Sequence, residues 1–312
     1  MADFRSGFVS IIGRPNAGKS TLLNALVGEK VAIVTHKPQT TRNRIQGMVN
    51  VKSAKGRPAG QIVFIDTPGV HKPESQLSKR MMQEVYDALE GRDLSLLIID
   101  ATQRFGTGDE FVLNLIREAG GRVFLLLNKI DLLPKDKLLP LIGDYSKRYK
   151  FEELIPISAH KKDGLEVLLT KVINALPSGP KYFPADQYTD QPERFLASEI
   201  IREKVLVAAG QEVPYATAVV IERYEEGKKL TKISATIFCE REGQKAILIG
   251  KGGSMLKKIG TGARLGLERL LGTKVFLELF VKVVPDWRSS KRFIEDLDWR
   301  RQLESLGTER LK

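Results

Sequence analysis

The sequence predicts an α/β protein, in which a doubly wound, mostly parallel sheet is followed by a smaller α+β domain. Two observations predict this. Up to residue 176, short apolar runs alternate with longer amphipathic stretches, which is the pattern of β–α units. After a proline-rich segment at 177–192, the order changes to helix, two strands, two helices and a strand. With 312 residues, each part is long enough to bury its own core.

In the first part, strands are expected from short apolar runs, and helices from apolar residues that recur every three or four positions. The predicted strands are 7–12, 45–51, 61–65, 94–100, 122–127 and 154–157, and the predicted helices are 19–27, 76–89, 109–117, 135–149 and 165–176. Because the basic loop 52–60 is short, the strands on either side of it are expected to pair antiparallel.

The second part is expected to begin with a helix at 193–207. Its other predicted elements are strands 216–224, 232–239 and 274–284, and helices 244–249 and 254–271, with GKGG (250–253) between these two helices. The predicted organisation is therefore a first domain at 1–176, a linker at 177–192, a second domain at 193–286 and an amphipathic helical tail at 287–312. In the tail, Phe293, Leu297 and Trp299 are expected to pack on the domain.

Part of the net charge of +12 lies in one basic window. The window 245–274 holds seven basic residues and one acid, which indicates either a polyanionic partner, nucleic acid or anionic membrane, or simply a solvated helix face. The single cysteine, Cys239, excludes an intrachain disulfide and fits a reduced, cytoplasmic compartment. The start, MADFRSGFVSII, does not resemble a secretory signal, and no apolar run approaches the roughly 20 residues that span a bilayer.

GRPNAGKS (13–20) matches the phosphate-binding pattern G-x-x-x-x-G-K-[ST] and lies between a predicted strand and a predicted helix. We expect the amides of this turn to face the β-phosphate, Lys19 to bridge the β- and γ-phosphates, and the Ser20 hydroxyl to bind Mg²⁺. Arg14 could act as an internal cation, an option we rank lower. The predicted nucleotide-binding residues of this loop are Gly13, Arg14, Pro15, Asn16, Ala17, Gly18, Lys19, Ser20 and Thr21.

DTPG (66–69) follows a predicted strand, which suits Asp66 to hold a water on Mg²⁺ and the Gly69 amide to meet the γ-phosphate. The polar segment 35–45 offers Thr40 and Thr41 as further Mg²⁺ ligands, and we favour Thr41. The loop residues assigned to the nucleotide site are Asp66, Thr67, Pro68, Gly69 and Val70. The metal ligands are predicted to be Ser20, Thr41 and Asp66, and the catalytic residues Lys19, Thr41, Gly69 and Asn16.

NKID (128–131) places the Asp131 carboxylate where it can accept from N1–H and the 2-amino group of guanine, a donor pair that adenine lacks. Lys129 is expected to lay its stem along the base, and Asn128 to tie this loop to the phosphate loop. In PISAH (156–160), the Ser158 hydroxyl and the Ala159 amide are expected near the guanine oxygen. The cofactors predicted are thus GTP or GDP with Mg²⁺. A small-molecule kinase shares the phosphate loop but has no need to select guanine.

GKGG lies between two predicted helices inside the basic window. Alone, it is typical of a helix hinge, but the window and the element order favour a GxxG loop that clamps an RNA backbone. Ile249 and Ile259 would supply an apolar floor for bases. The predicted RNA-binding residues are Ile249, Gly250, Lys251, Gly252, Gly253, Lys257, Lys258 and Arg264.

These motifs together resemble a Ras-like guanine-nucleotide-binding domain, and PQTTR with DTPG resembles the bacterial Era family of GTPases, in which a type II KH domain follows. The resemblance runs from about residue 8 to residue 284. Ras-like proteins carry a water-orienting glutamine where this chain has Val70, whose side chain cannot orient water. The family resemblance offers a substitute, in which Asn16 helps to hold K⁺ near the phosphates. Slow intrinsic hydrolysis is expected.

The resemblance implies a GTP-driven factor in assembly of the small ribosomal subunit, with the KH domain bound near the 3′ end of its ribosomal RNA. It also implies peripheral association with the cytoplasmic face of the inner membrane, and we expect a monomer. GTP would order 35–45 and 66–75 and change how the first domain packs on the second. The alternative is a constitutive RNA-binding protein whose nucleotide domain is mainly structural. The basic loop 52–60 departs from the family pattern, and its role stays open.

Overall fold

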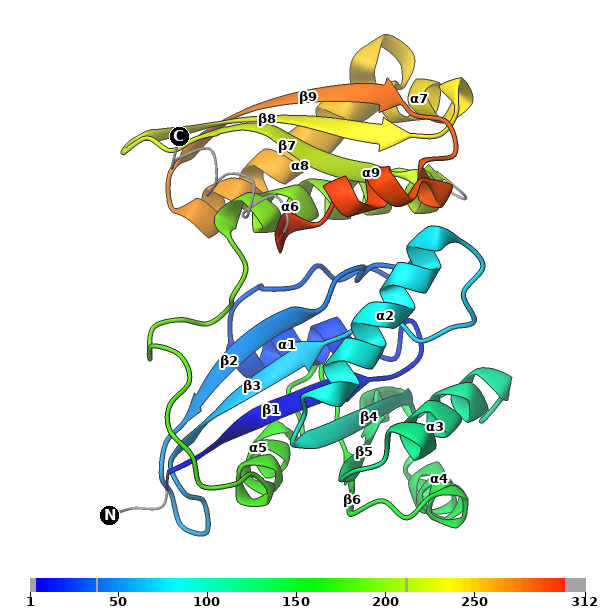
Figure 1. Ribbon diagram of the computed structural model, residues 1–312, viewed down its shortest axis with the longest axis vertical. Helices are drawn as coiled ribbons and strands as arrows, with labels where there is room; N and C mark the ends of the chain where they lie inside the picture. Colours follow the sequence, from blue (N-terminus) through cyan, green and yellow to red (C-terminus); the bar gives the residue numbers. More distant parts are fainter. Residues whose placement is uncertain (1–3, 38, 211–212, 301–312) are drawn as a thin grey trace. The chain divides into compact units, whose positions relative to one another are not determined.

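The computed structural model describes residues 4–37, 39–210 and 213–300 (Figure 1). Contacts divide the chain into two compact units, Met1–Lys72 with Met81–Asp190, and Pro73–Arg80 with Gln191–Lys312. Each unit has its own sheet and its own buried apolar core, so each is described by itself. Within the described ranges, no helix has the length and hydrophobicity needed to cross a bilayer.

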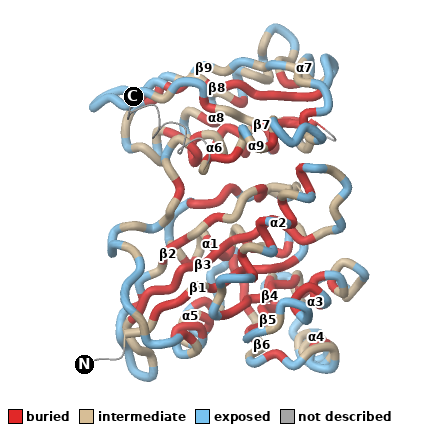
Figure 2. Tube along the Cα trace, in the orientation of Figure 1, coloured by how far each residue is buried: buried red, intermediate tan, exposed pale blue. Residues whose placement is uncertain are grey.

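The first unit contains a six-stranded sheet in the order β2-β3-β1-β4-β5-β6. Its strands are β1 (Arg5–Ile12), β2 (Ile45–Val51), β3 (Gly60–Asp66), β4 (Leu94–Asp100), β5 (Val123–Asn128) and β6 (Glu153–Pro156). Only the edge pair β2–β3 is antiparallel, as predicted from the short loop between these strands. Every residue of β3 and β5 is buried, which explains why these strands read as continuous apolar runs (Figure 2).

Helices cover both faces of this sheet, as the doubly wound class requires. They are α1 (Lys19–Val27), α2 (Gln76–Glu90), α3 (Thr107–Ala119), α4 (Lys135–Arg148) and α5 (Leu165–Ala175). Residues of α1 and α5 share one apolar cluster, and residues of α2, α3 and α4 share the other. The loops that follow β1, β3 and β5 therefore open at the same carboxyl-terminal edge of the sheet, where such folds bind ligands.

The basic loop 52–60 and part of the predicted linker are held to the first unit by side-chain contacts. In the basic loop 52–60, Arg57 forms an ion pair with Glu166 of α5 (Nη1–Oε2 2.7 Å), and the Gly56 carbonyl accepts from Asn174 (2.9 Å). Part of the predicted linker is held against β3, because the Gln61 side-chain oxygen accepts from the amides of Tyr182 and Phe183 (both 2.9 Å). These contacts tie both segments to the first unit, although most of their residues are exposed, and the domain boundaries themselves stay a prediction.

The second unit has a three-stranded sheet in the order β7-β8-β9, in which β8 pairs antiparallel with β7 and parallel with β9. Its elements are α6 (Glu193–Ala208), η2 (Val213–Ala216), β7 (Ala218–Glu225), β8 (Leu230–Cys239), α7 (Glu242–Ile249), η3 (Lys251–Gly253), α8 (Ser254–Leu271) and β9 (Lys274–Val283). Apolar residues of α6, α7 and α8 share one buried cluster with inward-facing residues of the three strands. The predicted α+β order is confirmed, with GKGG between α7 and α8.

The predicted single tail helix is wrong over the described residues. Two short elements follow β9, η4 (Trp287–Ser289) and α9 (Lys291–Asp296), and the helix is interrupted at 297–298. Burial of side chains fixes these pieces instead: Phe293 packs against Phe238 (ring centroids 5.2 Å apart), and Trp299 against Phe195 (5.7 Å). Residues 301–312 of the predicted tail lie outside the described residues.

Candidate functional site

The turn after β1 has the shape that a phosphate cradle needs. Gly18 adopts φ 104°, a left-handed conformation that disfavours any side chain, and a Cβ there would collide with the Asn128 amide. Asn16 also has a positive φ of 63°. The chain turns sharply before α1 begins at Lys19, so the unpaired amides at the start of this helix line the turn. An anion in the turn is favoured by these amides and by the helix dipole.

Two opposite charges are buried beneath this turn. The Lys19 ammonium donates to the carbonyls of Gly13 (3.0 Å) and Arg14 (2.9 Å), and burial lowers its pKa to about 8, against the attraction of Asp66. Burial also raises the pKa of the fully buried Asp66 carboxyl to about 6, although Lys19, Ser20 and Thr41 oppose the rise. Each charge lacks the solvation it would have in water, so both are poised to bind charged ligand groups.

Three oxygen-bearing side chains meet at this point. The Ser20 hydroxyl donates to Asp66 Oδ2 (2.6 Å) and lies 2.8 Å from the Thr41 hydroxyl, which itself reaches Asp66 (3.3 Å). Asp66 Oδ1 is buried and accepts no well-formed hydrogen bond from the described residues. Hard oxygen donors with one unsatisfied carboxylate oxygen fit Mg²⁺. Thr41, rather than Thr40, lies in this group.

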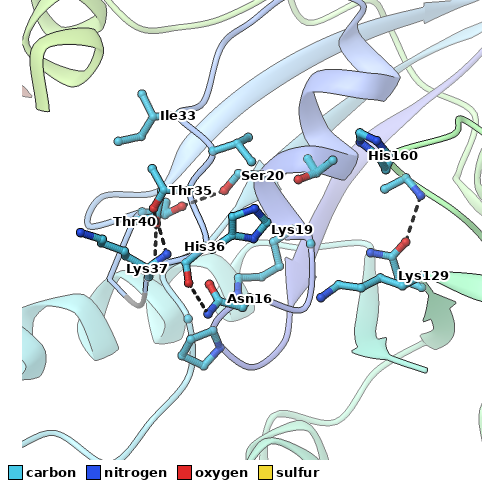
Figure 3. A pocket seen from close by; sticks show the side chains of 18 of the residues that line it. Asn16, Lys19, Ser20, Ile33, Thr35, His36, Lys37, Thr40, Lys129 and His160 are labelled. Carbon is cyan, nitrogen blue, oxygen red and sulfur yellow. Dashed lines mark hydrogen bonds between the residues drawn. The ribbon is translucent and has the colours of Figure 1, made fainter. Parts of the chain in front are cut away.

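The polar segment before Thr41 lies against the phosphate turn. The Asn16 side-chain amide donates to the His36 carbonyl (2.9 Å), as Figure 3 shows. The Thr40 hydroxyl instead lies 2.7 Å from the Thr35 hydroxyl and donates to the Lys37 carbonyl (2.6 Å). Thr40 is thus engaged within its own loop, and Thr41 is the threonine that reaches the buried carboxylate.

The DTPG loop combines buried anchors with one close backbone approach. The Thr67 hydroxyl donates to the Ile11 carbonyl (2.8 Å), and Val70 packs in an apolar cluster with its amide bonded to the Gly13 carbonyl (3.1 Å). Gly69 passes so close to Pro15 that a Cβ would lie 2.8 Å from the proline ring. Because Val70 points into the core, it has neither the chemistry nor the direction to orient a water.

Hydrogen bonds to two neighbouring loops hold the NKID loop in place. Asn128 donates to the Ala17 carbonyl of the phosphate turn (2.8 Å) and accepts from the Ala159 amide (2.9 Å). The Ser158 hydroxyl accepts from the Lys161 amide (3.1 Å). Both groups predicted to lie near the guanine oxygen are therefore engaged with protein atoms, and Ala159 serves here to orient Asn128. Asp131 is exposed and free to meet a base.

A cavity of about 650 Å³ joins these loops (Figure 3). The predicted residues that line it are Pro15, Asn16, Gly18, Lys19, Ser20, Thr21, Thr40, Thr41, Gly69, Asn128, Lys129, Asp131, Ser158 and Ala159. The predicted residues outside its lining are Gly13, Arg14, Ala17, Asp66, Thr67, Pro68 and Val70. Most of these residues contact the lining residues. Asp66, for example, accepts hydrogen bonds from Ser20 and Thr41, which line the cavity.

Arg14 points away from the nucleotide cavity. Its guanidinium pairs with Asp109 of α3 (Nη1–Oδ2 2.7 Å), whose carboxylate also accepts from the Gly106 amide at the start of that helix (3.0 Å). This pair agrees with the low rank given to Arg14 as an internal cation. The sequence did not point to Asp109, because nothing in the helical pattern of 109–117 distinguishes a carboxylate that caps the helix from one that pairs with an arginine.

The GKGG turn presents an open, basic surface. Gly250, Gly252 and Gly253 have φ of 72°, 59° and 79°, and a Cβ on Gly252 or Gly253 would meet nothing within 4 Å. Lys251, Lys257 and Lys258 are exposed, whereas Arg264 forms an ion pair with Glu268 (3.1 Å). Because the chain is open here and α8 begins at Ser254, a polyanion backbone can approach the start of a helix.

The prediction that Ile259 supplies an apolar floor for bases is wrong. Its side chain is 1% exposed in the core of the second unit, so it cannot floor a base-binding surface. Its position in a helix, five residues beyond Ser254, directs it inward with Ala263 and Leu267. Ile249, in contrast, is only partly buried at the end of α7.

A P-loop fold with a guanine-reading loop, followed by an α+β unit with a GxxG turn, defines the class of guanine-nucleotide-binding proteins that carry a KH domain. Family models agree: residues 8–129 match a 50S ribosome-binding GTPase, and residues 212–288 a KH domain. The chain is 52% identical to GTPase Era of Geobacter metallireducens over 95% of this chain and 98% of that protein. It is 48% identical to GTPase Era of Syntrophus aciditrophicus over 95% of each chain. The chain belongs to the Era family of GTPases.

Two solved Era structures have the same fold. A variant of Aquifex aeolicus Era bound to GDP·AlF₄⁻ is 41% identical, covers 94% of this chain and 98% of that chain, and gives a TM-score of 0.89. Era in complex with MgGDPNP and nucleotides 1506–1542 of 16S ribosomal RNA has the same identity, coverage and TM-score. The predicted two-part fold class is therefore confirmed over nearly the whole chain.

Proposed function

We propose that this protein binds GTP and GDP with Mg²⁺, hydrolyses GTP slowly, and binds small-subunit ribosomal RNA near its 3′ end during subunit assembly. One observation carries the nucleotide part: a single cavity is lined by the phosphate turn, the segment with Thr41, and the NKID loop with Asp131. Each of these loops has the chemistry for a different part of one molecule, namely the phosphates, the metal and the guanine ring. Era structures with GDP·AlF₄⁻ and with MgGDPNP support this reading.

The residues of the site divide the work. Lys19 exchanges its hydrogen bonds to the Gly13 and Arg14 carbonyls for phosphate oxygens, which relieves a buried, poorly solvated ammonium. Ser20, Thr41 and Asp66 would hold Mg²⁺, which when bound neutralises charge on the phosphates. The Gly69 amide and Thr41 would contact the γ-phosphate when it is present, since both lie in loops that line the cavity.

Val70 leaves the attacking water without a side-chain partner. Asn16 donates its amide nitrogen to the His36 carbonyl, which leaves its oxygen available for a monovalent cation. We propose that K⁺ occupies this place and supports hydrolysis. The cytoplasmic location, the contact with the inner membrane and the monomeric state stay predictions of the family resemblance.

The RNA part rests on the GKGG turn and its lysines, and on the Era complex with nucleotides 1506–1542 of 16S ribosomal RNA. The description of the G-domain family as 50S ribosome-binding belongs to residues 8–129 alone, and a small-subunit RNA is bound in that complex. We therefore favour the small subunit as partner. Coupling would follow if the two nucleotide states stabilise different arrangements of the chain.

Two variants separate this function from a constitutive RNA-binding protein. Gly252→Asp places a carboxylate against phosphate and should abolish RNA binding under either reading. Lys19→Ala should keep RNA binding but stop GTP hydrolysis and leave cells short of mature small subunits. Full complementation by Lys19→Ala would favour the constitutive alternative. RNA affinities measured with a GTP analogue and with GDP test the coupling, and equal values would remove it.

A further inference from the structure

Asp100 ends β4 directly beside the guanine-reading loop. The register of the parallel pair β4–β5 places Asp100 opposite Asn128, and the Ala101 amide donates to the Asn128 carbonyl (2.8 Å). Two carboxyl-terminal strand ends thus bring a carboxylate next to NKID. None of the sequence motifs includes this residue.

Both carboxylate oxygens of Asp100 are engaged. Oδ2 accepts from the Lys129 ammonium (2.6 Å), and Oδ1 accepts from the amide (3.0 Å) and the hydroxyl (2.6 Å) of Thr102. The Asp100 side chain is 17% exposed and that of Lys129 is 32% exposed. Burial alone would raise the pKa of Asp100, but the bonds from Lys129 and Thr102 hold the pKa below its usual value. Asp100 is therefore a charged group held in one position.

Asp100 reaches Lys129 from behind the nucleotide cavity. Lys129 lines the large cavity. Asp100 does not, and instead lines a smaller cavity of about 270 Å³ that is also lined by Pro15 and Asn16 of the phosphate turn. A lysine side chain is otherwise free to sample many rotamers, and ordering it on binding costs free energy. The ion pair fixes the ammonium, so the apolar stem is already placed where a base would lie.

The pairing also affects charge at the base site. Asp131 follows Lys129 by two residues and must keep its carboxylate free to accept from guanine. An unpaired ammonium on Lys129 would have Asp131 as the nearest acid along the chain. The ion pair with Asp100 (2.6 Å) engages the ammonium and leaves Asp131 available.

We infer that Asp100 is a positioning residue for guanine recognition, which acts through Lys129 and does not touch the nucleotide. The inference rests on the proposed nucleotide site. Removing the charge, as in Asp100→Asn, should weaken GDP binding about tenfold, because the lysine stem must then be ordered at the moment of binding. The turnover rate at saturating GTP should change little, since no phosphate contact is lost.

A double-mutant cycle tests this inference. GDP affinity is measured by calorimetry for the wild type, Asp100→Asn, Lys129→Met and the double variant, all as the full chain with Mg²⁺. The double variant should bind GDP as Lys129→Met does, because Asp100 has nothing left to position. If Asp100 had only a structural role, Asp100→Asn would weaken GDP binding by the same factor in the wild type and in Lys129→Met. Such additivity would overturn the inference.

Two further variants serve as controls for the effect of Asp100→Asn on GDP affinity. Thr102→Val keeps the Asp100 charge but removes the hydroxyl that fixes it, and should cost about threefold in the wild type and nothing in Lys129→Met. Asp136→Asn removes an exposed carboxylate of α4 and should leave affinity unchanged. If the wild type fails to bind GDP, the proposed function fails. If the wild type binds GDP and Asp100→Asn binds it equally well, only this inference fails.

Discussion

The buried carboxylate of Asp66 makes the nucleotide-free protein less stable than it would be with an uncharged side chain of the same shape at this position. Asp66 is fully buried, one of its oxygens accepts no well-formed hydrogen bond from the described residues, and its pKa is raised to about 6. Asparagine has nearly the same shape and no charge. We therefore predict that Asp66→Asn unfolds at higher denaturant concentration than the wild type at neutral pH, while it loses Mg²⁺-dependent nucleotide binding.

The magnitude follows from the pKa. A rise from 3.8 to about 6 is about two pKa units, and at 1.36 kcal/mol per unit it amounts to about 3 kcal/mol. Because the pKa of Asp66 is higher in the folded state, protonation of its carboxyl stabilises the folded protein. This stabilisation is complete below the pKa of the unfolded state and is lost as pH rises through the pKa of the folded state. The free energy of unfolding of the wild type should thus fall relative to Asp66→Asn between about pH 4 and pH 6, and level off above.

Urea unfolding followed by circular dichroism, in EDTA and without nucleotide, measures this difference. The two proteins should have similar free energies of unfolding near pH 3.5, and the variant should be about 3 kcal/mol more stable above pH 7. The exposed Asp136→Asn variant is the matched control and should follow the wild type. Parallel curves for wild type and Asp66→Asn, or a variant less stable at pH 7, would refute the reasoning.

Three further predictions concern the ligands. Asp131→Asn should weaken GDP binding by about a hundredfold, because one charge-assisted acceptor becomes a donor facing guanine donors, and should improve binding of xanthosine diphosphate; calorimetry measures both. Gly252→Asp should abolish binding of a 3′-terminal small-subunit RNA fragment in a filter assay; the melting temperature should fall only slightly, because a Cβ there meets no atom within 4 Å and aspartate tolerates the left-handed φ of 59° better than most residues. Phosphate release from GTP should be faster in KCl than in NaCl, and identical rates would exclude a role for K⁺.

Much of the fold was accessible from the sequence, because strand and helix periods were strong where burial was strong. The predicted helices 19–27 and 254–271 match α1 and α8, and the predicted strands 45–51 and 94–100 match β2 and β4. The ends of the other elements before the tail differ by no more than two residues. The tail failed for a physical reason: amphipathic spacing predicted one helix, but Phe293 and Trp299 pack against different partners, Phe238 and Phe195. Tertiary packing there outweighed the local period.

The site was predictable as motifs but not as a network. Sequence spacing placed Lys19, Thr41 and Asp131 at one edge of the sheet, and the cavity lining includes all three. It could not show that the Ala159 amide is already bonded to Asn128, or that Arg14 pairs with Asp109, because both contacts join residues from separate elements. Asp100 had a weak signal, an acid at the end of the strand next to NKID, which only the β4–β5 register turns into a contact.

The proposed function requires one cavity that binds a polyphosphate and selects guanine through Asp131. Titration calorimetry of the pure protein with GTP and with ATP, each with Mg²⁺, tests it most directly. We expect GTP to bind and ATP to bind at least a hundredfold more weakly, since adenine lacks the paired donors that the carboxylate requires. Equal affinities for the two nucleotides, or no binding of either, would contradict the account.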